Sequence, residues 1–149
     1  MFQKQVGPYP LGIWIVFIVL LAVFLGWGMQ AYSLLNWDGA VDIGFQNERF
    51  TGDAVERAWA HESWSVALVD VLWPLPIGIV AIVGLLRKRL FGFAAGLMEF
   101  AITVYFPLVF AFQRWTTYRS TALVALFLWA IPSFVGIICL WVNRKSFTQ

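Results

Sequence analysis

The feature that most constrains this chain is a pair of apolar segments joined by a short run of cations. The segments cover residues 66–86 and 90–112, and the run between them is Arg87-Lys88-Arg89. A helix rises about 1.5 Å per residue, so about 20 residues cross a hydrocarbon core of roughly 30 Å. The pair therefore predicts a hairpin of two membrane-spanning helices, with its cationic turn on the cytoplasmic side.

The composition extends this interpretation to the whole chain. Of the 149 residues, 61% are hydrophobic and 12% are charged, whereas a soluble domain carries about 25% charged residues. Two further apolar runs cover residues 11–35 and 121–142. We expect an all-α integral membrane fold, a single domain over residues 1–149 with four transmembrane helices in a bundle. The expected spans are about 11–35, 66–86, 90–112 and 121–142.

One long polar segment, residues 36–65, separates the first two spans and holds six of the eight acids. Asn36-Trp37-Asp38-Gly39 indicates a turn. Asp53, with Glu56 three residues later, resembles a capping box at the start of a helix. Because no helix breaker follows before residue 66, we expect the second helix to begin outside the membrane and to continue into it.

The ten cations divide unevenly between the two sides of this arrangement. Six of them belong to the terminal segments and to the turn of the hairpin: Lys4, Arg87, Lys88, Arg89, Arg144 and Lys145. The other side holds Arg49, Arg57, Arg114 and Arg119. Since Lys and Arg are enriched in cytoplasmic loops, both termini are predicted to be cytoplasmic. The predicted location is the cell inner (cytoplasmic) membrane, with residues 36–65 outside.

Tryptophan residues mark the predicted ends of the spans. An indole ring satisfies its N–H group in the headgroup layer while its apolar body stays in the membrane. We expect this position for Trp14, Trp37, Trp64, Trp115 and Trp141.

Asp70 is the first of two acids inside the apolar segments. It lies about five residues, or roughly 8 Å, below the outer edge of its span. An ionised carboxylate at depth costs on the order of 2–3 kcal/mol unless it is paired or hydrated. Candidate partners at a similar depth are Gln30, Tyr32 and Arg114. Two interpretations stay open: an Asp70–Arg114 clamp between helices, and an acidic floor of an outward-facing pocket.

Glu99 is the second acid, near the middle of its span. A carboxyl group at that depth is protonated, hydrogen-bonded across helices or exposed to a water-filled cavity. Gly96 and Thr103 lie on the same helical face, and Gly92 with Gly96 forms a GxxxG pattern that allows another helix to approach closely. We therefore expect Glu99 to face protein, either as structural hydrogen bonding or as a proton-linked or ligand-binding group.

Prolines within two of the spans bear on the choice between a transporter and a structural bundle. Pro74 and Pro76 in the second span and Pro107 in the third each remove a backbone donor. Two broken helices, each with an acid beside the break, are typical of transporters. They are equally a way in which ordinary helical bundles bend.

Cofactor and nucleic-acid sites are not expected. The chain has one histidine, His61, and one cysteine, Cys139, so it offers neither a bis-histidine haem site nor a CxxC motif. His61 is expected to be exposed, and Cys139 to be a packing residue or a palmitoylation site. The formal charge of +2, without a basic stripe interleaved with aromatics, does not suggest nucleic acid. No nucleotide or phosphate-binding motif occurs.

The hairpin resembles DoxX-like proteins, small bacterial membrane proteins with four spans. The resemblance rests on Asp70, then Gly84-Leu85-Leu86 with the basic run, then Gly92-Phe93-Ala94-Ala95-Gly96. It implies a four-helix membrane architecture, and some of these proteins look like small subunits of quinone-linked oxidoreductases. The long acidic segment between Asp38 and Glu62 departs from the pattern.

Two function classes follow from these observations. The first is an accessory subunit of a membrane complex, whose partners are the lipid bilayer and other subunits or a second copy of the chain. The second is a small transporter or binder of a lipophilic or cationic ligand, for example a lipid or quinone-like molecule, using Asp70 and Glu99. An enzyme comes third, because no nucleophile or metal cluster is visible.

Overall fold

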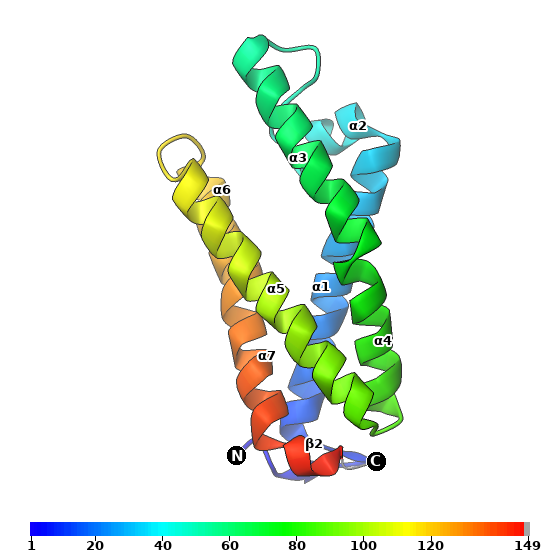
Figure 1. Ribbon diagram of the computed structural model, residues 1–149. Helices are drawn as coiled ribbons and strands as arrows, with labels where there is room; N and C mark the ends of the chain where they lie inside the picture. Colours follow the sequence, from blue (N-terminus) through cyan, green and yellow to red (C-terminus); the bar gives the residue numbers. More distant parts are fainter. Residues whose placement is uncertain (148–149) are drawn as a thin grey trace. The chain divides into compact units, whose positions relative to one another are not determined.

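The computed structural model describes residues 1–147 and is 78% helical. Figure 1 shows the elements in order. The chain begins with two short antiparallel strands and continues through helical segments that follow one another closely. They are β1 (Gln5–Val6), β2 (Tyr9–Pro10), α1 (Leu11–Leu35), α2 (Trp37–Asp42), α3 (Ala54–Leu72), α4 (Pro74–Leu86), α5 (Leu90–Arg114), α6 (Arg119–Ala125), the π-helical η1 (Leu126–Ala130), α7 (Ile131–Val142) and the 3₁₀ turn η2 (Arg144–Ser146).

Four helical segments are long and apolar enough to cross a membrane. They are Leu11–Leu35, Ala54–Leu86, Leu90–Arg114 and Arg119–Val142. The expected fold class, an all-α membrane protein with four spans, is confirmed. The second segment begins at Ala54, well before the apolar stretch that starts at residue 66, as the sequence predicts.

The chain divides into two compact units. The first contains Met1–Val23 and the chain from Ile77 onward, and the second contains Phe24–Pro76. The single membrane domain expected from the sequence stays a prediction, and the two units are described separately.

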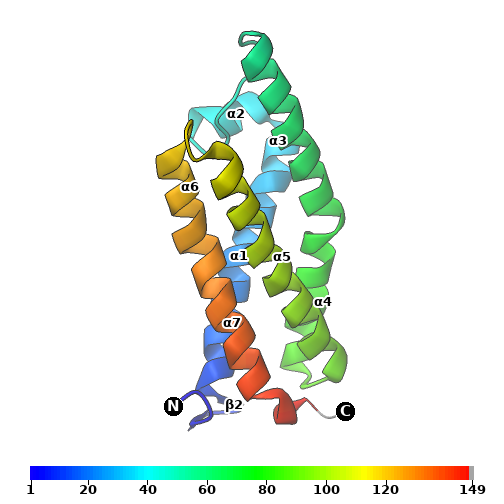
Figure 2. The same cartoon turned by 60° about the vertical axis from the view of Figure 1, so that its left-hand side comes forward.

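In the first unit, α5 packs along the continuous run of α6, η1 and α7, as both views show (Figures 1 and 2). Small residues make this contact close. A Cβ atom on Gly136 would lie 2.5 Å from Cε2 of Phe100, and one on Gly96 would lie 3.0 Å from Cδ1 of Leu140. Gly92 faces the backbone of Gly84 in α4 just as closely. The GxxxG pattern therefore allows two different helices to approach α5.

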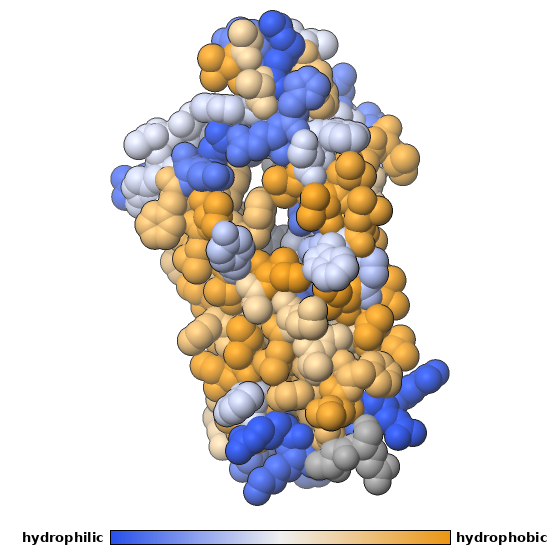
Figure 3. All heavy atoms as spheres, in the orientation of Figure 1, coloured by the Kyte–Doolittle hydropathy of each residue, from blue (hydrophilic) through white to orange (hydrophobic). Residues whose placement is uncertain are grey.

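One end of the first unit joins the N-terminal strands, the α4–α5 turn and the C-terminal end of α7. The Tyr9 hydroxyl donates a hydrogen bond to the carbonyl of Leu86 (2.8 Å), and Nε2 of Gln3 donates to the carbonyl of Val142 (3.1 Å). In Figure 3, hydrophilic residues gather at this end, while hydrophobic residues cover α4, α5 and α7. The six cations predicted to be cytoplasmic belong to these three segments.

In the second unit, the helix starts depend on side-chain caps. Oδ1 of Asp53 accepts from the backbone N–H groups of Val55 and Glu56, so the predicted cap is confirmed. The other half of a capping box is missing, because Glu56 accepts from the backbone N–H of Arg49 instead. The turn predicted at Asn36 is wrong. Asn36 caps α2, and its Oδ1 accepts from the N–H of Gly39.

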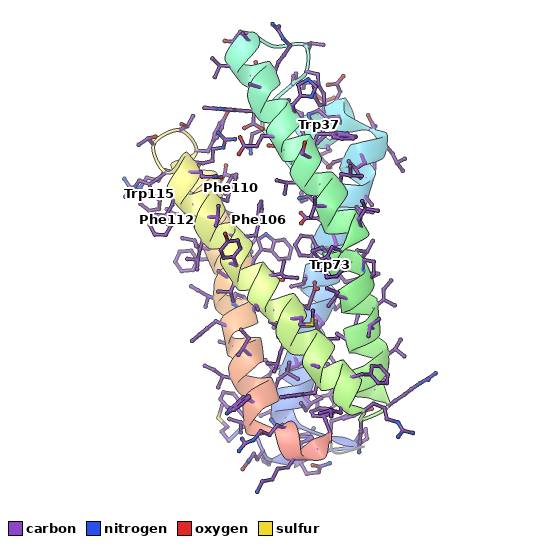
Figure 4. The ribbon with its side chains drawn as sticks, in the orientation of Figure 1. Trp37, Trp73, Phe106, Phe110, Phe112 and Trp115 are labelled. Carbon is purple, nitrogen blue, oxygen red and sulfur yellow. The ribbon has the colours of Figure 1, made fainter. Side chains whose placement is uncertain are left out.

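The indole N–H of Trp37 does not take its predicted partner in the headgroup layer. Trp37 is buried within the second unit, and its indole N–H donates to the carbonyl of Glu48 (2.7 Å). Figure 4 shows the ring where α2 lies near α3. A protein carbonyl thus satisfies the indole in place of the headgroup layer.

The prolines act in different ways. The second span is interrupted at Trp73, between α3 and α4, as the Pro74 and Pro76 pair predicts (Figure 4). The break expected at Pro107 is wrong, since α5 continues through it from Leu90 to Arg114. A helix tolerates one lost N–H donor where its neighbours hold it in place, and Pro107 lies on the buried face of α5.

Candidate functional site

The second unit holds a connected set of polar side chains around Asp70, of which Ser33, Gln46 and Asp70 are buried and Gln30 is half-buried. Nε2 of Gln30 donates to Oδ2 of Asp70 (3.1 Å), and Nε2 of Gln46 donates to Oε1 of Gln30 (2.9 Å). Nε2 of Gln46 also lies 3.1 Å from the hydroxyl of Ser33. We call these four residues the Asp70 cluster. Asp70, with 5% of its surface exposed, is therefore hydrogen-bonded inside the protein.

Three segments position this cluster. Gln30 and Ser33 lie three residues apart on α1 and therefore share a face. Asp70 comes from the last turns of α3. Gln46 follows α2, where the backbone N–H groups of Phe45 and Gln46 both donate to the carbonyl of Ala40. That folded-back loop turns the Gln46 amide inward.

The structure brings together some of the predicted partners of Asp70. Gln30 contacts it as expected. Within residues 1–147 Tyr32 makes no hydrogen bond to Asp70, and its hydroxyl accepts one from Nδ2 of Asn36 (3.1 Å). Arg114 is a buried residue of the first unit, and the Asp70–Arg114 clamp stays a prediction.

Glu48 is a second buried acid in the polar segment that sequence reasoning missed. Only 2% of its surface is exposed, and its Oε2 lies 3.4 Å from the hydroxyl of Ser63, which donates to it. The burial of Glu48 depends on how the segment folds over α3, whereas that of Gln46 depends on how the segment folds against α1. The flanking aromatics Phe45 and Phe50 were the available signal, since apolar residues in a polar loop indicate a local core.

In the first unit, Glu99 is fully buried. It lies on the packed face of α5, which contains Gly92, Ala95, Gly96, Glu99, Phe100, Thr103, Pro107, Ala111 and Arg114. A Cβ atom on Gly78 would lie 3.6 Å from the carboxyl carbon of Glu99. Glu99 therefore faces α4, and the expectation that it faces protein is confirmed.

Two hydroxyl groups accompany Glu99 in this interior. The Thr103 hydroxyl donates to the backbone carbonyl of Glu99 (2.8 Å). The contacts of Gly96 with Leu140 and of Phe100 with Gly136 set an antiparallel register that places Ser133 level with Thr103. The Ser133 hydroxyl is buried and has no hydrogen-bond partner within residues 1–147.

The remaining candidate residues lie outside these two sites. His61 is exposed and meets the Phe50 ring edge-on, with 4.8 Å between centroids. Cys139 is buried, as expected of a packing residue. Arg49 binds Asp42 and lies 3.6 Å from Asp38, and the hydrogen bond with Asp42 raises the pKa of the Arg49 guanidinium. Within residues 1–147, no three His, Cys, Asp or Glu side chains are grouped to hold a metal ion.

The two buried acids of the apolar spans, Asp70 and Glu99, have different surroundings. The Asp70 cluster ties α1, α3 and the loop after α2 together by hydrogen bonds, whereas Glu99 and its hydroxyl neighbours lie among closely packed helices. Comparison with family models, with curated proteins and with solved structures finds no match to this chain. The resemblance of the hairpin to DoxX-like proteins stays a prediction.

Proposed function

We propose that this membrane protein is an accessory subunit of a larger complex in the cell inner (cytoplasmic) membrane. The Asp70 cluster is the main support. Its acid is hydrogen-bonded to an amide that is itself held by a second amide, so the most conspicuous polar group of the second span is accounted for by packing. The partners of the protein are then lipid and other membrane subunits, or a second copy of the chain.

The DoxX-like resemblance belongs to this proposal. The hairpin residues from Asp70 to Gly96 are similar to those of small four-span proteins, some of which look like subunits of quinone-linked oxidoreductases. Large exposed apolar side chains, such as Tyr105, Phe112 and Phe127, supply a surface for lipid tails or partner helices. Figure 4 labels Phe112, beside Trp115 near the end of α5.

Purification of the full-length protein in mild detergent tests this proposal. Asp70→Asn is the informative variant, because an amide has a similar size and still accepts a hydrogen bond from Gln30. We expect the wild type and Asp70→Asn to retain the same partner subunits in the same ratio. A monomeric wild type that retains a small lipophilic or cationic molecule, with loss of that molecule in Asp70→Asn, would contradict the proposal.

A second candidate is a small binder or transporter of a lipophilic or cationic ligand. One observation favours it: Glu99, Thr103 and Ser133 put three polar side chains into the interior of the first unit, and the Ser133 hydroxyl has no hydrogen-bond partner within residues 1–147. For this function, Glu99→Gln should abolish ligand binding while leaving the melting temperature unchanged. Unchanged binding in Glu99→Gln would exclude Glu99 from such a site.

A further inference from the structure

Positive charge is concentrated at one end of the first unit, where the two terminal segments and the α4–α5 turn meet. All six of its Lys and Arg side chains are exposed: Lys4, Arg87, Lys88, Arg89, Arg144 and Lys145. Seven of the eight acids lie between Asp38 and Asp70 and the eighth is Glu99, so none belongs to the terminal segments or to the turn at residues 87–89. Within residues 1–147, none of the six forms an ion pair with a carboxylate. We call these six residues the basic end.

The backbone segments of the basic end are held together rather than loosely attached. The Tyr9 hydroxyl donates to the carbonyl of Leu86, just before the α4–α5 turn, and Gln3 donates to the carbonyl at the end of α7. The short pair of strands β1 and β2 turns at Gly7, whose φ of +60° suits a glycine. The cations therefore extend from a fixed scaffold, which lowers the conformational entropy lost when they bind an anion together.

Aromatic rings lie beside two of these cations, as is typical of residues at the level of a lipid headgroup. Nζ of Lys88 lies 5.1 Å from the centre of the Tyr9 ring, and the Arg144 guanidinium lies 5.2 Å from the centre of the Trp141 ring. Tyr9 also packs edge-on against Trp14, whose indole N–H donates to the carbonyl of Val6. Tyr and Trp rings are enriched where a bilayer core meets its headgroups. The charges next to them thus lie at phosphate depth.

We propose that the basic end binds the phosphodiester headgroups of anionic phospholipids. Six exposed cations without a protein carboxylate beside them need external anions, and the adjoining apolar helices leave lipid as the anion source at that depth. Each basic residue near an anionic membrane surface strengthens binding about fivefold. This inference does not depend on the proposed accessory function, since it uses residues on neither polar site.

The test measures lipid binding to purified full-length protein in mild detergent by native mass spectrometry. Phosphatidylglycerol and phosphatidylcholine with the same acyl chains are the probes. We expect the wild type to retain much more phosphatidylglycerol than phosphatidylcholine. The triple variant Arg87→Gln/Lys88→Gln/Arg89→Gln should bind it roughly 100-fold more weakly. Equal retention of the two lipids by the wild type would overturn the proposal.

A matched pair of single variants keeps the test decisive if the triple variant does not fold. Arg144 lies over Trp141, and Arg119, at the other end of α6–α7, lies over Trp115 at 5.0 Å. Arg144→Gln should weaken phosphatidylglycerol binding about fivefold, and Arg119→Gln should leave it unchanged. Equal losses of phosphatidylglycerol binding in the two variants would show that the lipid does not bind preferentially at the basic end.

A last arm separates a lipid from free phosphate. Sodium phosphate and sodium chloride at equal ionic strength should displace phosphatidylglycerol equally, because both act only by screening charge. Greater displacement by phosphate would identify a site for the free anion and would overturn the assignment to lipid.

Discussion

At the scale of single residues, the two membrane-embedded acids differ in their surroundings. Asp70 is hydrogen-bonded to Gln30, which Gln46 holds in turn. Glu99 lies against Gly78 of α4, on the tightly packed face of α5. A buried polar group that loses its partner costs about 1–3 kcal/mol, whereas removal of both partners is nearly neutral. Asp70 is therefore tested by removing its partner Gln30, and Glu99 by changing its own carboxyl group.

Removal of the Gln30 amide tests the Asp70 cluster. Gln30→Leu leaves the Asp70 carboxylate without its hydrogen bond and should lower the free energy of unfolding in detergent by about 1–3 kcal/mol. Gln30→Leu/Asp70→Leu should recover most of this loss. Tyr32→Phe, on the same helix, is the control, because the hydrogen bond of the Tyr32 hydroxyl is with the exposed side chain of Asn36. Equal losses in Gln30→Leu and Tyr32→Phe would mean that the cluster does not stabilise the fold.

Glu99→Gln tests whether Glu99 acts as structural hydrogen bonding. The amide has the same size and still donates and accepts hydrogen bonds. The free energy of unfolding in detergent should therefore change by no more than about 0.5 kcal/mol. Glu99→Leu should destabilise the protein by about 1 kcal/mol, because a hydrogen bond between membrane helices contributes about that much. A large loss in Glu99→Gln would show that the protein requires a carboxyl group at this position.

At the scale of elements, glycines determine how closely α5 approaches its neighbours. Gly136→Ala places a Cβ atom 2.5 Å from Phe100 and should destabilise the protein by about 1–3 kcal/mol. Gly28→Ala in α1 is the matched control, since nothing lies within 4 Å of a Cβ atom there. It should be neutral or stabilising by up to about 1 kcal/mol. Similar melting temperatures for the two variants would contradict the packing of α5 against α7.

The elements also show how far the sequence predicted the fold. The four spans, the early start of α3 at Asp53 and the break at Trp73 follow from local signals: apolar run length, a capping side chain and paired prolines. The continuity of α5 through Pro107 and the π-helical turn at Leu126–Ala130 do not, because tertiary packing decides whether a helix tolerates a lost donor.

The candidate sites were predictable to a lesser degree. Depth in the membrane selected Asp70 and Glu99, and similar depth selected Gln30. Gln46 and Glu48 were missed because the burial of a loop residue depends on how the loop folds back, which the nearby Phe45 and Phe50 only indicate. Ser133 was missed because a serine within an apolar helix does not show which helix faces it. Tyr32 was wrong as a partner for Asp70 because it lies two residues from Gln30, and therefore on a different face of α1, where its hydroxyl accepts a hydrogen bond from Asn36.

At the scale of the whole molecule, the central claim is a multi-pass membrane protein with both termini and the α4–α5 turn on the cytoplasmic side. Single cysteines test this topology most directly. They are introduced in a Cys139→Ser background, which removes the native thiol, a buried one. Ile43 in the polar segment, Phe91 after the basic turn and Ser146 near the C-terminus are exposed positions for these cysteines. The reagent is a membrane-impermeant maleimide added to intact cells.

The account predicts labelling at Ile43→Cys in intact cells. Phe91→Cys and Ser146→Cys should be labelled only after the membrane is permeabilised. Labelling of Phe91→Cys and Ser146→Cys in intact cells, with protection of Ile43→Cys, would reverse the orientation. Opposite behaviour of Phe91→Cys and Ser146→Cys would contradict the four-span topology itself.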